Sequence, residues 1–306
     1  MVELLSGYVM YSLSYILIFV ALATLLHLQF GLTGIVNFGI VGFWGLGMYV
    51  FGVSLLQYNF PYIVSLILAT VLTGVVALAL GRVILDLDNQ AILVATLAFA
   101  TVVRYIVTTE KWLTRGVLGL GTVPFPFDLG QYSQFGFFLI ILLVTIALLL
   151  YTYKLGSSPY GRLLASIQDN EILAQSLGKP TFREKLIFFT ITSALIGFFG
   201  ALNASVEHFL IPHVLTTGVT FTVWIALILG GRKRILGGLI GVIVTIGVLD
   251  FIIETYAPIP TAYAPLVPNL KYMIYGLTLM LILIFRPLGI LGEKKSTKIL
   301  KVIRKL

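Results

Sequence analysis

The chain contains a succession of long apolar stretches, each close to the length that an α-helix needs to cross a lipid bilayer. A hydrocarbon core of roughly 30 Å requires about 20 mostly apolar residues in a helix. Inside lipid the backbone groups must bond to one another, so such stretches predict helices. Nine stretches qualify: 9–28, 32–56, 61–81, 91–109, 135–153, 186–206, 217–231, 235–255 and 269–285. The sequence therefore predicts an all-α, polytopic transmembrane bundle with about nine spans, in the range of eight to ten.

Two of these stretches are irregular. The stretch 217–231 is short, and the stretch 32–56 is long and rich in glycine. Either can be a broken or re-entrant helix instead of a simple crossing. The composition supports the membrane class, since only 10% of the residues are charged and 59% are hydrophobic. A soluble domain has about 25% charged residues, so a soluble globular protein is excluded.

Basic residues fall mainly on one side of the predicted membrane. If the polar segment 154–185 lies on one side of the membrane and each successive span crosses to the other side, 16 of the 20 Lys and Arg residues lie on the same side as that segment. Loops rich in Lys and Arg stay in the cytoplasm. This bias predicts a cytoplasmic segment 154–185, an outer N-terminus and a cytoplasmic C-terminus. Nucleic acid is not expected as a partner, because the modules that read bases require a soluble domain that this chain lacks.

The polar segment 154–185 is long for a connection between two spans. Ser158 followed by Pro159 is typical of a helix start. Either Asp169 or Asn170 can cap a second short helix, which Gly178 and Pro180 then end. We expect two short helices with a polar elbow, lying across the face of the membrane. Such a segment is either a connecting loop packed on its own spans or a docking surface for another protein.

The residues of this segment follow a recognisable order. Tyr160-Gly161-Arg162, Ala165, Asp169-Asn170-Glu171, Ala174 and Gly178 resemble the cytoplasmic coupling loop of permeases from ABC importers. The pattern is most similar to the branched-chain amino acid permease family. Four other stretches agree in order with that family: Gly31 to Tyr49, Thr114 to Pro124, Gly230 to Gly241, and Arg286 to Gly292. The outer glycine loop and the Arg286-Pro287-Leu288-Gly289 exit favour the larger of the two paralogous membrane subunits.

The resemblance implies a function and a set of partners. It implies a permease subunit in the cell membrane that carries branched-chain or related amino acids by alternating access. It also implies separate ABC ATPase subunits that bind the ATP, an extracytoplasmic solute-binding protein, and a second permease subunit, either an identical copy or a paralogue. In that family the coupling loop docks into the ATPase, so the resemblance assigns this role to Gly161, Arg162, Ala165, Asp169, Asn170, Glu171, Ala174 and Gly178. Residues 1–292 would form one permease domain.

The chain departs from the family pattern at three positions. Ile40 follows Gly39 where the family often has a histidine. Gly238 follows Gly237 where the family commonly has a proline after the glycine, and Gln168 replaces a frequent basic residue. The first two departures lie near the expected pathway, so they leave the identity of the transported solute open. The third lies in the coupling loop, and it leaves the coupling role intact.

The glycine-rich stretch suggests where substrate passes. Small residues let membrane helices approach closely and permit breaks where the backbone lines a cavity. Asn37 lies within this stretch and can hydrogen-bond across helices or to a substrate. Close helix packing without ligand contact is the alternative interpretation. The residues that we assign to the translocation pathway are Gly34, Asn37, Gly39, Gly42 and Phe43.

Several other functions are disfavoured by what the sequence lacks. No phosphate-binding Gly-x-x-x-x-Gly-Lys-Ser/Thr pattern occurs, so an ATP-driven transporter would need its ATPase on another chain. There is no cysteine and there are three histidines, which argues against a metal site or an integral membrane enzyme. A self-sufficient secondary transporter or channel is the alternative function, although it would require ionisable residues deep in the spans. The basic tail 293–306 is either an amphipathic helix on the inner leaflet or a frayed end.

Overall fold

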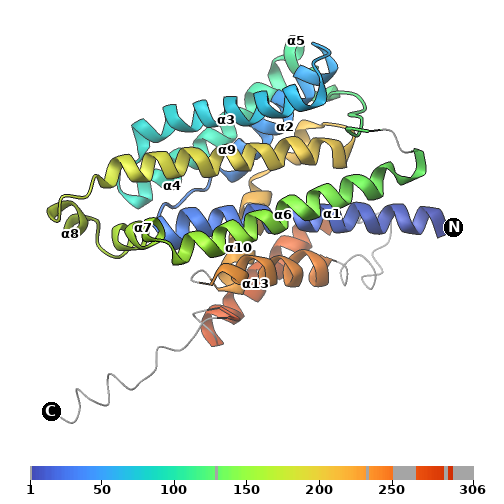
Figure 1. Ribbon diagram of the computed structural model, residues 1–306. Helices are drawn as coiled ribbons and strands as arrows, with labels where there is room; N and C mark the ends of the chain where they lie inside the picture. Colours follow the sequence, from blue (N-terminus) through green and yellow to red (C-terminus); the bar gives the residue numbers. More distant parts are fainter. Residues whose placement is uncertain (1, 128–129, 232–233, 251–266, 286–288, 292–306) are drawn as a thin grey trace.

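The protein is a bundle of long helices that run roughly side by side (Figure 1). The computed structural model describes residues 2–127, 130–231, 234–250, 267–285 and 289–291. Within these ranges the regular structure is helical, apart from one isolated bridge between Leu120 and Leu210. The long helices are α1 (Val2–Leu26), α2 (Ile40–Leu56), α3 (Tyr62–Ile84), α4 (Asn89–Thr109), α6 (Ser133–Ser157), α9 (Thr181–Glu207), α10 (Thr217–Gly230) and α13 (Val267–Phe285).

The shorter elements connect these helices or extend them. A π-helix, η1 (His27–Leu32), continues α1, and a second one, η5 (Ile243–Asp250), continues α11 (Ile235–Val242). The helix α5 (Lys111–Thr114) follows α4, and α7 (Pro159–Asp169) and α8 (Glu171–Ser176) lie between α6 and α9. The remaining single turns are η2 (Gly116–Leu118), η3 (Gly130–Tyr132) and η4 (Pro212–Val214).

The predicted helical bundle is confirmed. Each of the nine predicted spans contains helical residues, although 32–56 is interrupted at residues 34–39 and the end of 235–255 lies outside the described residues. Among the residues that the structure describes, five helices are long and apolar enough to cross a membrane, and the number of spans stays a prediction. The helices α10 and α2 are shorter, at about 21 Å and about 26 Å for a rise of 1.5 Å per residue. Both fall short of a hydrocarbon core of roughly 30 Å. The predicted basic tail 293–306 lies outside the described residues.

The stretch 32–56 is not one helix. The first helix continues through η1 to Leu32, residues 34–39 are not helical, and α2 begins at Ile40. Gly34 has a φ of +74°, in the left-handed region that glycine adopts without a steric penalty. The chain thus leaves the helical conformation at Gly34 and passes through a non-helical segment before it enters α2. We call residues 33–39 the crossover segment.

The core of the bundle is built around α9, which packs most extensively against α2 and α3. Glycines allow two of these helices to touch through their backbones. A methyl group at Gly47 would overlap the backbone of Gly197, and one at Gly200 would overlap the carbonyl oxygen of Trp44. The helices α2 and α9 are therefore joined more closely than side chains of ordinary size permit.

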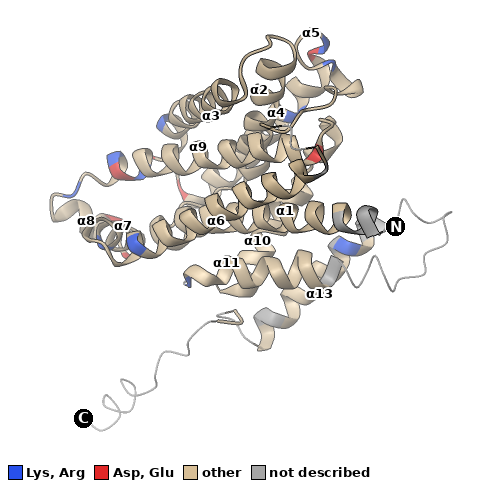
Figure 2. Cartoon of the chain, turned by 45° about the vertical axis from the view of Figure 1, so that its right-hand side comes forward, with Lys and Arg blue, Asp and Glu red and all other residues tan. Residues whose placement is uncertain are grey.

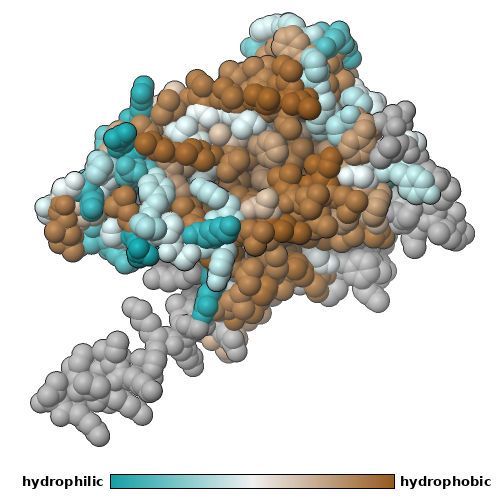
Figure 3. Space-filling view, in the orientation of Figure 1, coloured by the Kyte–Doolittle hydropathy of each residue, from teal (hydrophilic) through white to brown (hydrophobic). Residues whose placement is uncertain are grey.

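The surface of the bundle is apolar along its length and polar at one end. Figure 3 shows apolar side chains over the middle of the molecule and hydrophilic ones gathered around α7 and α8. Large exposed apolar residues lie on the outer faces of α3 and α4, among them Ile67, Val75 and Val94. This distribution fits a helical bundle surrounded by lipid with one large hydrophilic end. Which end faces the cytoplasm stays a prediction.

Candidate functional site

The first candidate site is the pair of short helices α7 and α8. The Ser158 hydroxyl accepts a hydrogen bond from the Gly161 N–H at 3.0 Å, and Pro159 occupies the first helical position. At the elbow the Asn170 side chain accepts from the Leu173 N–H at 3.0 Å, so Asn170, and not Asp169, caps α8. Gly178, with a φ of +77°, follows the end of α8. The two helices and the elbow predicted from the sequence are confirmed.

The helix α7 is fixed against the bundle along one face. Leu164 and Ile167 are buried, and a methyl group at Gly161 would overlap the carbonyl oxygen of Leu155 in α6. Tyr160 lies beside Phe188 of α9 and hydrogen-bonds to Glu184. Burial and the neighbouring Glu184 carboxylate together raise the pKa of the Tyr160 hydroxyl to about 12. The hydroxyl therefore stays protonated and can donate to the Glu184 carboxylate.

Two further contacts tie the short helices to the long ones. The Lys185 Nζ atom, at the start of α9, pairs with the Glu171 carboxylate at the start of α8 at 3.0 Å. Lys185 is buried, and its partner is partly exposed. The Gln168 side-chain amide donates to the Phe30 carbonyl of η1 at 3.1 Å. The segment is thus linked to α9 and to the end of the first helix, and neither link follows from the sequence pattern.

The opposite face of α8 is exposed and apolar. Ile172 is 77% exposed, Leu177 is 71% exposed, and Leu173 is also exposed. Figure 2 shows charged residues gathered around these helices at this end of the bundle. Three large apolar side chains among charged residues form a surface that no other described part of the chain covers. We call Ile172, Leu173 and Leu177 the α8 patch.

The predicted coupling residues divide between the buried and the exposed side of the segment. Gly161 and Ala174 are buried, and Ala165 and Glu171 are partly buried. Arg162, Asp169, Asn170 and Gly178 are exposed. The first group holds the segment on the bundle, and the second group lies at its surface. The family resemblance assigned all eight residues to the same role, whereas the structure divides them by burial. Their role in coupling stays a prediction.

The second candidate site is the crossover segment, which is held by a buried polar network. The Asn37 amide donates to the Gln29 side chain at 2.8 Å, and Asn37 Oδ1 accepts from the Gly39 N–H at 2.7 Å. Gln29 in turn donates to Thr192 at 2.8 Å and to Ser193 at 3.1 Å, both on α9. This network satisfies polar groups that would otherwise be costly to bury. It fixes the crossover segment to the central helix.

Hydrogen bonds and aromatic rings attach the crossover segment to α4 and α10 as well. The Phe38 N–H donates to the Thr96 hydroxyl at 3.0 Å, and the Trp224 indole donates to the Asn37 carbonyl at 3.0 Å. The Phe38 ring stacks on Trp224 with 4.6 Å between centroids, and Phe221 meets Phe38 edge-on at 5.8 Å. The first turns of α2 and α10 meet here, because the Val41 N–H lies 3.3 Å from the Thr220 hydroxyl.

The five residues assigned to the pathway differ in burial. Asn37, Gly39, Gly42 and Phe43 are buried, while Gly34 is only partly buried. A methyl group at Gly39 would lie 2.7 Å from the Thr96 carbonyl, and one at Gly42 would lie 2.8 Å from the Cα of Ala100. Phe43 packs between Phe99 and Phe189. These contacts favour close helix packing for four of the residues, and their place in a pathway stays a prediction.

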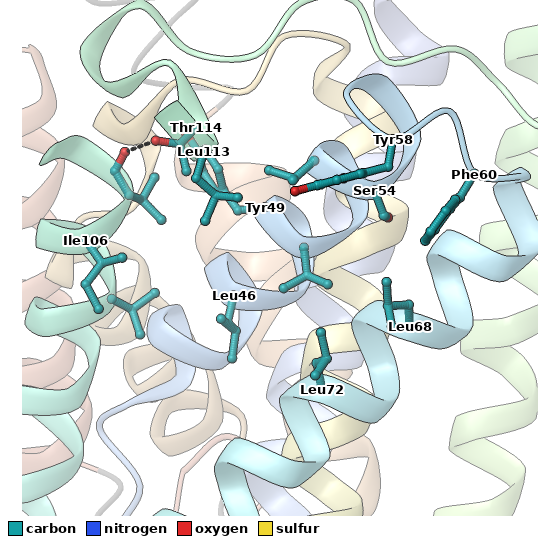
Figure 4. A pocket seen from close by; sticks show the side chains of 14 residues that line it. Leu46, Tyr49, Ser54, Tyr58, Phe60, Leu68, Leu72, Ile106, Leu113 and Thr114 are labelled. Carbon is teal, nitrogen blue, oxygen red and sulfur yellow. Dashed lines mark hydrogen bonds between the residues drawn. The ribbon is translucent and has the colours of Figure 1, made fainter. Parts of the chain in front are cut away.

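A separate cavity of about 400 Å³ lies between α2, α3, α4 and α5 (Figure 4). Its lining is almost entirely apolar. Two of its hydroxyl groups are already engaged, since Ser54 donates to the Phe51 carbonyl and Thr114 donates to the Val107 carbonyl. The lining contains no charged side chain. The Tyr49 hydroxyl also lies in this lining and is buried without a hydrogen-bond partner among the described residues. The cavity can hold an aliphatic chain and offers a hydroxyl group, but no opposite charge, to an amino acid.

Comparison with known proteins identifies the class of this bundle. The family described as "Branched-chain amino acid transport system / permease component" matches residues 8–283, which is most of the chain. The chain belongs to this permease family. The permease is accordingly an integral membrane protein, as its helices also indicate. No solved structure matches it.

Individual relatives refine this assignment. The permease is 28% identical over 240 residues to the "High-affinity branched-chain amino acid transport system permease protein LivM" of Salmonella typhimurium, covering 70% of this chain and 56% of that protein. It is 25% identical over 239 residues to the probable LivM of Methanocaldococcus jannaschii, covering 75% and 69%, respectively. The probable LivH of the same organism is 26% identical over 219 residues, covering 66% and 64%. These matches are consistent with the larger paralogue, and the match spans little more than half of the Salmonella relative.

Proposed function

We propose that this permease is a membrane-spanning subunit of an ABC importer that carries branched-chain or related amino acids across the cell membrane. The family membership supports transport of this solute class. The observation that carries the ABC assignment is the α8 patch, an exposed apolar surface at the charged end of the bundle. The ATP would be bound by separate ATPase subunits, so this chain acts as a transport subunit and not as an enzyme.

The α8 patch has the chemistry of a docking surface. Fully burying a Leu or Ile side chain contributes about 1.5–3 kcal/mol relative to leaving it exposed. Three such side chains on two turns of helix can anchor a helix in an apolar groove of a partner. The charged residues around the patch keep this end of the bundle in water. A soluble ATPase is a partner that could reach this surface.

The contacts of α7 and α8 suggest how movement would be transmitted. The Glu171–Lys185 pair links α8 to the first turn of α9, and Gln168 links α7 to the Phe30 carbonyl. When ATP closes the ATPase subunits, a displaced α8 would pull on α9, while α7 would pull on η1 and the crossover segment. As these helices tilt relative to a second permease subunit, the pathway would open alternately to the two sides of the membrane. That subunit is either an identical copy or a paralogue, and an extracytoplasmic binding protein would deliver the amino acid.

A docking variant tests the proposal. The permease, its second permease subunit and the ATPases would be reconstituted in vesicles with the binding protein and leucine, and leucine-stimulated ATP hydrolysis would be measured. We expect Leu177→Asp, and independently Ile172→Asp, to abolish stimulation because a carboxylate cannot enter an apolar groove. Ser157→Asp, at another exposed position at the end of α6, is the control and should leave it unchanged. Full stimulation with both α8 variants would refute the docking role.

A further inference from the structure

We propose that one face of the crossover segment forms a wall of the water-filled translocation pathway. This wall consists of Val36 and Phe38 together with Phe221 of α10. Phe38 and Phe221 contact the aliphatic side chain of the transported amino acid, and the opposite wall belongs to the second permease subunit. This inference rests on the proposed transport function and names the part of the chain that the substrate meets.

The crossover segment lies at membrane depth. Phe38 bonds to Thr96, which is seven residues into α4, or about 10 Å along the helix at 1.5 Å per residue. Asn37 bonds to Gln29, whose partner Thr192 is eleven residues into α9, or about 16 Å along it. Each of these helices continues for a further 20 Å or so beyond these points. The segment is therefore enclosed within the length of the spanning helices and not at their ends.

Burial alternates along the segment. Thr33, Ile35, Asn37 and Gly39 are buried, whereas Gly34, Val36 and Phe38 are partly exposed. The buried side is anchored by the polar network. The other side is covered at Gly34 by Gln168 of α7 and is less covered at Val36 and Phe38. The segment thus presents a single edge of non-helical backbone to whatever surrounds the bundle at this depth.

Lipid cannot be what surrounds this edge. Non-helical backbone at membrane depth is tolerated only where it is buried in protein or lines a water-filled cavity, because hydrocarbon offers it no hydrogen bonds. The outer faces of α3 and α4, by contrast, are regular helix with large apolar side chains and suit lipid. The less covered edge of the crossover segment therefore faces water or a second protein subunit. In a transporter of small solutes, the surface at membrane depth where water meets a second subunit is the wall of the translocation pathway.

The side chains on this edge suit an amino acid with an aliphatic side chain. One face of the Phe38 ring is covered by Trp224, and the residue is still half-exposed. Phe221 is 46% exposed beside it. Two aromatic rings at an angle to each other form an apolar corner for a branched side chain. Water and the unwound backbone of the same edge can then solvate the ammonium and carboxylate groups of the substrate.

The absence of cysteine from the chain makes the test direct. Phe38→Cys and Phe221→Cys would each be the only cysteine of the permease in the reconstituted transporter. A small charged methanethiosulfonate would be applied to both sides of the vesicles, since it reacts with a thiolate and requires water at the site. Ile67→Cys, on the outer face of α3, is the matched lipid-facing control, and Phe43→Cys is the control for close packing. Leucine-driven ATP hydrolysis of the unmodified transporter is measured in parallel.

We expect Phe38→Cys and Phe221→Cys to react about tenfold faster or more than either control, because the thiolate forms only where water reaches. Saturating leucine should slow both reactions. Reaction rates equal to those of the controls, or unaffected by leucine, would overturn the wall assignment even if transport is intact. A transporter that shows no leucine-driven ATP hydrolysis would instead refute the proposed function. Phe221→Cys keeps the test valid if Phe38→Cys does not fold, since Phe221 is exposed.

Discussion

The Glu171–Lys185 ion pair makes a quantitative prediction, because its two members differ in burial. The Lys185 side chain is 9% exposed and the Glu171 side chain 38% exposed. Removing one member of a fully buried pair costs about 3–5 kcal/mol, whereas an exposed pair contributes about 0–1 kcal/mol. A pair with one buried and one partly exposed member lies between these limits. We expect Glu171→Gln to destabilise the permease by about 2 kcal/mol, because Lys185 is left buried without its counter-charge.

A double-mutant cycle isolates this interaction. The second change is Lys185→Met, which keeps an unbranched side chain of similar length while it removes the charge. We expect a coupling energy of about 1–2 kcal/mol, since the double variant no longer buries an uncompensated charge. The assay is unfolding of the purified permease in mixed micelles, followed by tryptophan fluorescence. Arg183→Met, an exposed residue two positions away, is the control and should change stability by less than about 0.5 kcal/mol.

The same variants report on the function of the pair. If the pair holds α8 in its docked position, about 2 kcal/mol corresponds to a roughly 30-fold change in the docked population. Leucine-stimulated ATP hydrolysis should therefore fall in Glu171→Gln and recover in part in the double variant. A coupling energy within about 0.3 kcal/mol of zero, the usual error of additivity, would show that the pair does not hold α8.

Two other predictions follow from the same end of the bundle. Replacing Gly161 with leucine should abolish stimulation of the ATPase while the protein still folds, because a side chain there would displace α7 from Leu155 of α6; normal stimulation together with a native circular dichroism spectrum would contradict this. The permease purified alone should hydrolyse no ATP, since its sequence has no phosphate-binding loop; turnover above that of an empty-vesicle control would overturn its role as a transport subunit.

The helices of this protein are predictable from its sequence because lipid leaves the backbone few alternatives. The caps of α7 and α8 are predictable for a local reason, since Ser158 and Asn170 act on backbone groups three residues away. The break after the first helix is predictable only in outline. Glycine content indicates that a break is present, but only the contact of Gln29 with α9 determines where the polar network closes.

The candidate sites depend on pairs of residues far apart in the sequence, which a single sequence does not reveal. Lys185 is an ordinary basic residue at the start of a span until the structure places it beside Glu171. Gln168 is only a departure from a family pattern until its amide meets the Phe30 carbonyl. The same holds for Phe38 and Phe221, which belong to two different predicted spans. The glycines and Asn37 could be selected from the sequence by residue type alone. The roles of Lys185, Gln168, Phe38 and Phe221 depend on where the fold places them.

The backbone contact between Gly47 and Gly197 has a mechanical consequence. Close backbone contact leaves little room for two helices to move toward each other, and the side chains around the contact limit sliding and tilting. We therefore expect a displacement of the start of α9 to carry α2 with it, and the start of α2 adjoins the crossover segment. The aromatic corner at Phe38 would then shift in step with Lys185, so the glycines that make the bundle compact also connect the ion pair at its charged end to the crossover segment in its middle.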